Sequence, residues 1–532
     1  MRSPGVEKTQ ERIGWGDGTF SDYTAVRFSP AGFRFLDIDQ QEPQVKLKDA
    51  GYLRWVKALG RGATAPRIVA FLRLERDRAV GELFPGLQSH TEAGEELLSA
   101  NSLITHTLRT LLACGWLRCD GGRWQPIVPA RESAWRQRGQ AVLSLLEGEK
   151  RLHLELGPGV RPPDRVTFDG FDALKDLIPV GRLGFPRELV WRERPRLLFN
   201  TAFFLLEHHD FFSFHSALGE PYGLFVEEGI IRRPPLYRRA ALCQRGDGSW
   251  QAALFSMADL EITLPDGTRL ICAEEQGSGE ARERRFSLNA PAEVTLYTRA
   301  YGLASQGRVP GCTPAEPGRV ELTVIERRVV GWKADGGLDI PQNGFVLSFA
   351  PGVLKAESLA ALRARPRVSY RFLRPEHQGI VQALQAGPLL LQGGRSALTP
   401  TRLAEEEFWV DRPGDDGSVH IGIVPTEFPD DVDRTRAARI GLGVDGEGQL
   451  AVVAVAGAEK GARLAGVDSQ GATLAELTAL LAEAGALEAI NLDGGGSTQL
   501  FFLGGLTIAA GGRLGLPGVH YERMVPSVGL LP

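Results

Sequence analysis

The sequence predicts an α+β protein in which a mostly helical N-terminal domain precedes a larger, β-rich domain built on mixed sheets. Its 532 residues are enough for two or more domains, each with its own core. The 64 glycines and 33 prolines indicate many turns, which is typical of a β-rich body. Apolar residues at helical spacing gather before residue 128, whereas short apolar or alternating runs follow it to the C-terminus.

The N-terminal part is expected to start as a flexible lead-in over residues 1–20, which are polar and glycine-rich. Residues 21–128 hold several short helical segments and a longer one at Ser102–Leu112. Asp120-Gly121 then predicts a tight hairpin. Helices followed by such a hairpin resemble a winged helix-turn-helix module. The residues that would face DNA in it are Thr105, His106, Arg109, Arg118 and Arg123.

This candidate DNA-binding face is only thinly basic. Because phosphate contacts supply most non-specific affinity for DNA, a protein contact or a homodimer through this domain is favoured over DNA binding. The polar residues 129–145 form the expected linker, and a second domain is expected over 146–532.

Charge and cysteine usage indicate a cytoplasmic protein. The formal net charge of −4 gives no argument for nucleic acid or an acidic membrane as a partner of the whole chain. The five cysteines are scattered and odd in number, which fits a reducing compartment better than a disulfide framework. The first residues lack the apolar segment of a signal peptide, and no apolar run is long enough to span a bilayer.

One stretch of the second domain combines polar side chains with three glycines in a row. Three predicted elements lead into it. They are a strand at Leu450–Ala456, a helix that begins at Thr473 with capping-box spacing, and a strand at Leu487–Leu492. Ligands in α/β units tend to bind where such a strand ends. Asp493 could act there as a base, a nucleophile or a metal ligand, and the glycine amides could form an anion nest. The structural alternative is a tight connection whose buried Asp bonds the loop amides.

The stretch Asn491–Thr498, with the sequence Asn-Leu-Asp-Gly-Gly-Gly-Ser-Thr, resembles the signature of the phosphodiester glycosidase family. Further elements of that family follow in the same order over about residues 195–532. They are an Asn-x-x-Phe-Phe element at Asn200–Phe204, a segment at Arg439–Asp445, and a closing Glu522-Arg523 strand. The family pattern has a hydroxyl residue and Ala where this chain has Ile440 and Gly441.

The resemblance implies hydrolysis of the glycosidic bond of a sugar-1-phosphodiester similar to N-acetylglucosamine-1-phosphodiester, carried by a small molecule or a glycan. Asp493 would be the carboxylate that activates water or stabilises an oxocarbenium-like transition state. Arg439 and Arg523 would offer forks to the phosphate. The second carboxylate stays open between Glu228, Glu427 and Glu522, and Arg523 could instead pair with Glu522. The residues expected to bind substrate or hold the loop are Asn200, Asn343, Asn491, Gly494, Gly495, Gly496, Ser497 and Thr498.

No cofactor and no metal site is expected. His208, Asp210 and His215 could ligate a metal, but the phenylalanines between them favour an aromatic loop over the site. The acidic run at Asp430–Asp433 is best explained as a solvated turn, with calcium as the alternative.

A non-catalytic function is the alternative to hydrolysis. In it, the second domain senses a sugar phosphate or a nucleotide-like ligand, and the N-terminal module passes the signal to DNA or to a partner protein. A third and weaker alternative is a purely structural part of a larger assembly. The Ile440 departure and the lack of a signal peptide favour the sensor. The enzyme is favoured by the presence of Asp493, the glycine run, Arg439 and Arg523.

Overall fold

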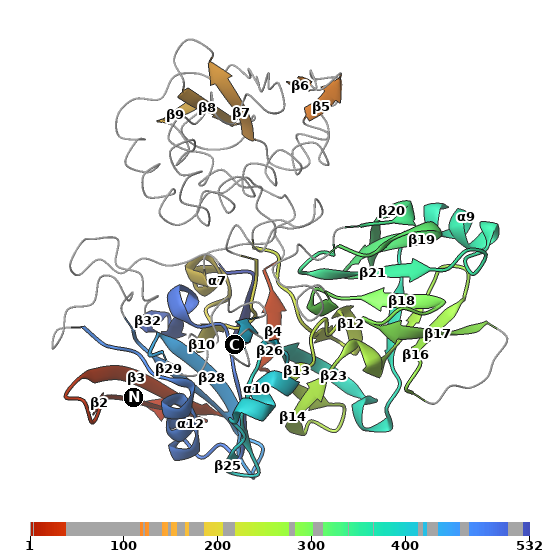
Figure 1. Cartoon of the computed structure of the whole chain (residues 1–532). Helices are drawn as coiled ribbons and strands as arrows, with labels where there is room; N and C mark the ends of the chain where they lie inside the picture. Colours follow the sequence, from red (N-terminus) through yellow and green to blue (C-terminus); the bar gives the residue numbers. More distant parts are fainter. Residues whose placement is uncertain are drawn as a thin grey trace. The chain divides into compact units, whose positions relative to one another are not determined.

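The structure is a computed structural model of the chain (Figure 1). It divides into two compact units, one of residues 1–38, 184–204 and 221–532, the other of residues 39–183 and 205–220. The residues that the structure describes are 2–3, 5–38, 117–120, 123–126, 141–146, 151–156, 165–169, 186–205, 219–275, 282–301, 312–338, 340–364, 366–412, 419–422, 435–457, 468–508 and 525–532.

An eight-stranded sheet in the first unit carries the element that ends at the glycine run. Its order is β1-β2-β3-β29-β28-β30-β24-β25, and every neighbouring pair is antiparallel. The predicted strand, helix and strand before the glycines are confirmed as β29, α12 and β30. The bounds are β1 Arg2–Ser3, β2 Val6–Gly14, β3 Phe20–Phe28, β29 Leu450–Val455, β28 Arg439–Val444, α12 Leu474–Glu483, β30 Glu488–Asn491, β24 Leu389–Gln392 and β25 Arg395–Ser396.

Helix α12 packs closely on this sheet, and the glycines of β28 make room for it. The helix begins at the predicted capping box, in which Thr473 and Glu476 bond each other's backbone amides at 3.2 and 2.8 Å. A Cβ at Gly441 would lie 2.8 Å from Leu481 Cδ1, so a larger residue there would require the Leu481 side chain to move. This contact gives a physical reason for the glycine at a position where the family pattern has Ala.

Two five-stranded sheets complete the core of this unit. The first has the order β32-β31-β10-β33-β4, and the second has the order β12-β11-β23-β13-β14. Phe33, which precedes β4, contacts both: its ring stacks on Phe199 of β10 at 6.0 Å and lies 5.7 Å from Trp250 of β14. The bounds are β32 Gly505–Ile508, β31 Leu500–Phe502, β10 Leu197–Asn200, β33 Ser527–Leu531, β4 Arg34–Asp37, β12 Ile230–Arg233, β11 Phe225–Glu227, β23 Ile380–Gln385, β13 Arg239–Arg245 and β14 Trp250–Phe255.

The long middle of the chain forms a second eight-stranded sheet, of order β20-β19-β21-β18-β17-β16-β15-β22. This sheet is mixed, because β16 and β18 both run parallel to β17 while the other pairs are antiparallel. The prediction of a β-rich body with mixed sheets is therefore confirmed. The bounds are β20 Arg328–Gly336, β19 Ala315–Ile325, β21 Gly344–Phe349, β18 Val294–Tyr297, β17 Glu283–Leu288, β16 Arg269–Cys272, β15 Leu260–Thr263 and β22 Ser369–Phe372.

The other described elements of the first unit are short. Among them, the single turn η5 lies inside the glycine run. The bounds are α7 Pro186–Glu193, η3 Met257–Asp259, α9 Ala356–Ala364, η4 Pro375–His377, α10 Pro400–Glu405, β26 Trp409–Arg412, β27 Val419–Gly422 and η5 Gly495–Ser497. In the described part of the chain, no helix has the length and apolar character needed to cross a membrane.

The prediction of a flexible lead-in over residues 1–20 is wrong. Residues 6–14 and 20–28 form β2 and β3, two paired strands of the first sheet, and Tyr23–Phe28 is strand where a mostly helical domain was expected to begin. The cause is the position of β2 in the sheet. Most of its side chains are exposed or only partly buried, so its polar composition is like that of a loose segment. Strand β3 instead buries alternate residues, among them Val26 and Phe28.

The second unit contains the hairpin that the sequence predicted. Asp120 lies opposite Arg123 where β5 turns into β6, as the Asp120-Gly121 pair indicated. The winged-helix prediction gains no support, because Ser102–Leu112 and the other predicted helices lie outside the described residues. Strand β7 also begins inside the expected 129–145 linker. The bounds are β5 Leu117–Asp120, β6 Arg123–Pro126, β7 Ala141–Leu146, β8 Arg151–Leu156 and β9 Arg165–Asp169.

Candidate functional site

Gly494, the first glycine of the run, passes so close to the backbone before β28 that a side chain there would clash with it. A Cβ at Gly494 would lie 2.9 Å from the carbonyl oxygen of Ala438 and 3.6 Å from Cδ of Arg439. The Gly495 amide donates to the same Ala438 carbonyl at 2.7 Å, with φ at +57°, in the left-handed region. The run therefore docks the loop directly against Arg439, which unites two of the residues that the sequence singled out.

Contact with Ala438 occupies one of the three glycine amides that were predicted from the sequence to form an anion nest. Since the Gly495 amide bonds Ala438, a nest in this conformation would depend on the amides of Gly494 and Gly496. The next two amides close the turn η5: that of Ser497 donates to the Gly494 carbonyl at 3.1 Å, and that of Thr498 to the Gly495 carbonyl at 3.2 Å. The anion-binding role of the loop stays a prediction.

Asn200 holds the two ends of the loop together. From the end of β10, its Nδ2 donates to the Asp493 carbonyl at 2.7 Å, and its Oδ1 accepts from the Gln499 amide at 2.9 Å. The Asp493 amide donates to the neighbouring Thr201 carbonyl at 2.9 Å. Of the two roles expected for Asn200, these contacts provide the loop-holding one. The carboxylate of Asp493 is thus presented on a backbone that is fixed at both its amide and its carbonyl.

The hydroxyl and amide groups beside Asp493 are buried. Asn491 donates from Nδ2 to the Gly387 carbonyl at 3.0 Å, which ties the loop to the turn before β24. Its Oδ1 and the hydroxyl of Thr498 have no hydrogen-bond partner in the described part of the chain, and Thr498 is fully buried. Buried polar atoms without partners are rare in folded proteins. These two atoms flank the loop on either side of Asp493, and Ser497, also buried, lies between them in sequence.

The side chain of Arg439 is buried and aligned by backbone carbonyls. It is 8% exposed, with Nε donating to the Ala472 carbonyl at 3.2 Å and Nη2 to the Thr435 carbonyl at 3.0 Å. The two bonds come from segments on either side of the guanidinium, so its orientation is fixed. A bidentate grip on phosphate through the Nε and Nη2 edge would have to replace these bonds. The Thr435 and Ala472 carbonyls thus set the direction of the Arg439 guanidinium.

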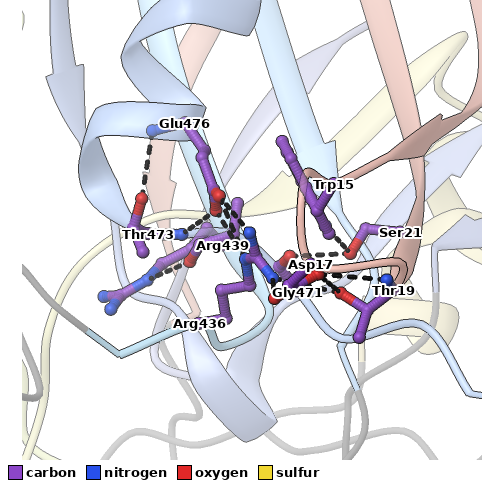
Figure 2. A network of polar contacts seen from close by, with 10 residues as sticks. Trp15, Asp17, Thr19, Ser21, Arg436, Arg439, Gly471, Thr473 and Glu476 are labelled. Carbon is purple, nitrogen blue, oxygen red and sulfur yellow. Dashed lines mark hydrogen bonds and ion pairs between the residues drawn. The ribbon is translucent and has the colours of Figure 1, made fainter. Parts of the chain in front are cut away.

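Sequence reasoning missed a second arginine next to this group. Arg436 bonds both carboxylate oxygens of Glu476, at 2.6 to 3.0 Å, and donates from Nη1 to Asp17 at 2.6 Å and to the Thr19 hydroxyl at 3.1 Å (Figure 2). Its guanidinium also lies 4.8 Å from the centre of the Trp15 ring. No local pattern could have found this network, because its members come from three distant parts of the chain.

The carboxylates of this network are ionised at neutral pH. Hydrogen bonds from the Thr19 hydroxyl and amide lower the pKa of Asp17 to about 2, with a further contribution from Arg436. For Glu476, burial acts to raise the pKa, but hydrogen bonds from Arg436 and from the Thr473 amide outweigh it and lower the pKa. A lowered carboxylate pKa means that the folded state gains stability from the ionised form.

We therefore expect Glu476→Gln to destabilise the protein at neutral pH and to have less effect in acid. Gln keeps the capping box and loses only the charge that faces Arg436. The stability that ionised Glu476 contributes is present above the unfolded pKa of about 4.3 and is lost as pH falls through the lowered folded pKa. Urea unfolding of both proteins at several pH values measures this. A difference between them that stays constant down to pH ~3 would contradict the expectation.

Other predicted site residues lie elsewhere or outside the described part. Asn343 is buried in the turn before β21, and Glu228 is exposed at the tip of the β11–β12 hairpin with φ at +50°. Among the described residues, no group of three or more His, Cys, Asp or Glu could hold a metal ion. The predicted residues outside the described ranges are His208, Asp210, His215, Glu427, Asp430–Asp433, Glu522 and Arg523.

Fold and loop together define a β-rich protein in which the glycine run after Asp493 lies against the backbone next to a buried Arg. Residues 326–528 match the family model described as phosphodiester glycosidase. The matched segment includes Arg439 and the whole of Asn491–Thr498, so the family resemblance drawn from these motifs is confirmed over this segment. No curated protein sequence matches the chain.

Three solved structures show a distant likeness to all or most of the chain. A hypothetical protein from Synechocystis is 16% identical, with 98% of this chain and 99% of that chain covered and a TM-score of 0.36. A protein from Burkholderia pseudomallei, described as exported, is 16% identical, with 99% and 96% covered and a TM-score of 0.38. The catalytic domain of zebrafish N-acetylglucosamine-1-phosphodiester alpha-N-acetylglucosaminidase is 13% identical, with 74% and 82% covered and a TM-score of 0.31. At these TM-scores the likeness supports no functional conclusion.

Proposed function

We propose that this protein hydrolyses the glycosidic bond of a sugar-1-phosphodiester. One observation carries the proposal: the segment that matches the phosphodiester glycosidase family contains both Arg439 and the Asp493 loop, and the fold docks the loop against the backbone next to that arginine. A positive group and a carboxylate on adjacent segments suit a substrate that carries a phosphate beside its anomeric carbon.

In the proposed reaction, Asp493 activates water or stabilises positive charge at the anomeric carbon. Water adds to that carbon, the bond from the carbon to the bridging oxygen breaks, and the phosphate leaves as a monoester. Because the leaving group is already a stabilised anion, the reaction depends less on a general acid than hydrolysis of an ordinary glycoside does. Arg439, Arg523 and the loop amides would hold the phosphate, and the Thr498 hydroxyl would be a further donor.

A paired set of substrates tests this function. The protein is incubated with an N-acetylglucosamine-1-phosphodiester panel and, as the matched control, with methyl glycosides of the same sugars that lack the phosphate. We expect free sugar and phosphomonoester in equal amounts from the first set and no product from the second. Release of a sugar phosphate and an alcohol would place the cleavage at phosphorus and contradict the proposal. Binding of a panel member without turnover would support the sensor instead.

A further inference from the structure

A three-part ion-pair network ties the first hairpin of the chain to the segment that carries Arg439. Strands β2 and β3 are joined by Trp15–Thr19, where the Trp15 amide donates to the Thr19 carbonyl at 2.8 Å. The carboxylate of Asp17 accepts from the Thr19 amide and hydroxyl, at 3.0 and 2.6 Å, so it is held in place before it meets Arg436. The tip of the hairpin is thus a preformed acceptor for a guanidinium.

The same hairpin reaches the start of α12 through a second contact. Trp15 Nε1 donates to the Ser21 hydroxyl at 2.9 Å, and that hydroxyl donates to the Gly471 carbonyl at 2.7 Å (Figure 2). Ser21 is fully buried. Gly471 has φ at +82°, and a Cβ there would lie 2.2 Å from the Ala437 carbonyl oxygen. Hairpin, helix start and the 435–439 segment therefore meet at one point, with no space for a side chain between them.

Arg436 is the residue that joins the three parts. Its fork binds Glu476 at the first turn of α12, its Nη1 binds Asp17 on the hairpin, and its own backbone belongs to the 435–439 segment. The next residue, Ala437, exchanges two hydrogen bonds with Ala472, at 3.2 and 2.9 Å. The two carbonyls that align Arg439 are those of Thr435 and Ala472, one residue before Arg436 and one after Gly471.

We propose that Arg436 is a positioning residue for the candidate site, and that the tip of the β2–β3 hairpin, Trp15–Thr19, is a working part of that site. Arg436 fixes the 435–439 segment between the hairpin and α12. That segment in turn sets the direction of the Arg439 guanidinium and, through the Ala438 carbonyl, the place of the glycine loop. The inference rests on the proposed function for its catalytic consequence, but its structural part stands on the contacts alone.

The ion pair between Arg436 and Asp17 contributes to alignment rather than to stability. Exposed ion pairs add little to stability, and Asp17 is more than half exposed in its pair with Arg436. The side chains of Arg436 and Glu476 are each 21% exposed, and the fork geometry fixes direction as well as distance. Small displacements of positioned groups can reduce a rate by about 100-fold. The ion pairs of Arg436 can therefore have a large effect on turnover through the position of the 435–439 segment.

The test compares Arg436→Met with Arg12→Met. Arg12 is a matched control that lies in β2 of the hairpin. It pairs with Asp22 at 2.7 Å and covers the Phe20 ring at 3.9 Å. Both of these partners belong to the hairpin itself, so the two contacts do not link it to the 435–439 segment. On a sugar phosphodiester that the wild type hydrolyses, we expect Arg436→Met to lower kcat by about 10- to 100-fold with KM within about threefold. Arg436→Lys, which keeps the charge without the fork, should show an intermediate loss.

Hydrogen–deuterium exchange gives a second readout that needs no activity. Amides of Ala437 and Gly495 should exchange about tenfold faster in Arg436→Met than in wild type, and should be unchanged in Arg12→Met. Equal kcat and equal exchange in the two Met variants would overturn the inference. A wild type that hydrolyses no panel member would overturn the proposed function alone, because the exchange of these two amides would still decide the role of Arg436.

Discussion

Replacing Asp493 by Asn should lower turnover of a sugar phosphodiester by about 1,000-fold, with little change in stability. The side chain keeps its size and loses the negative charge that the proposed mechanism places near the anomeric carbon. The loop should keep its position, because the Thr201 carbonyl and the Asn200 amide hold the backbone of residue 493. Initial rates measure the loss, and a thermal melt checks the fold.

The matched control for this change is Asp247→Asn. Asp247 lies in the exposed turn between β13 and β14, where it accepts from the Ser249 amide at 2.9 Å, and the substitution removes the same charge. We expect wild-type turnover from this variant. If Asp493→Asn retained turnover within about tenfold of the control, the carboxylate would not be the catalytic group, and Asp493 would be a structural residue of the loop.

Replacing Asn200 by Ala should destabilise the protein by about 2–4 kcal/mol and also impair turnover. The side chain is 1% exposed and satisfies the Asp493 carbonyl and the Gln499 amide, so its loss leaves both groups without this partner in a buried place. Each end of the glycine loop would then be held by backbone hydrogen bonds without the Asn200 side chain. The midpoint of urea unfolding measures the first effect, and kcat measures the second.

Asn289→Gly is the matched control for Asn200. Asn289 also makes two side-chain hydrogen bonds, to the hydroxyl and the amide of Thr298, at 2.9 and 2.8 Å, and it lies after β17 in the mixed sheet. Its φ of +53° suits glycine, so the change removes the bonds without backbone strain. This variant should lose stability and keep kcat. A similar loss of kcat in both variants would mean that Asn200 acts only through overall stability.

Local patterns were sufficient to predict the elements around the glycine run. The capping box at Thr473 and the leucines of α12 specify that helix within a single stretch of chain, and an apolar run specifies β29. The N-terminal strands were missed because β2 carries mostly polar residues, and its strand structure depends on hydrogen bonds to β3 rather than on its own pattern.

The sequence by itself determined that the chain has a β-rich body and a polar glycine run after a strand, because period and turn chemistry act over a few residues. It also carried the family signature that points to sugar phosphodiesters. Only the tertiary structure decided why Gly494 and Gly495 are glycines: Gly494 passes against Ala438, and Gly495 has a positive φ. It likewise decided that Asn200 holds the loop and that Arg436 links it to the hairpin at Asp17. Those contacts join residues hundreds of positions apart, and only the folded chain brings them within hydrogen-bonding distance.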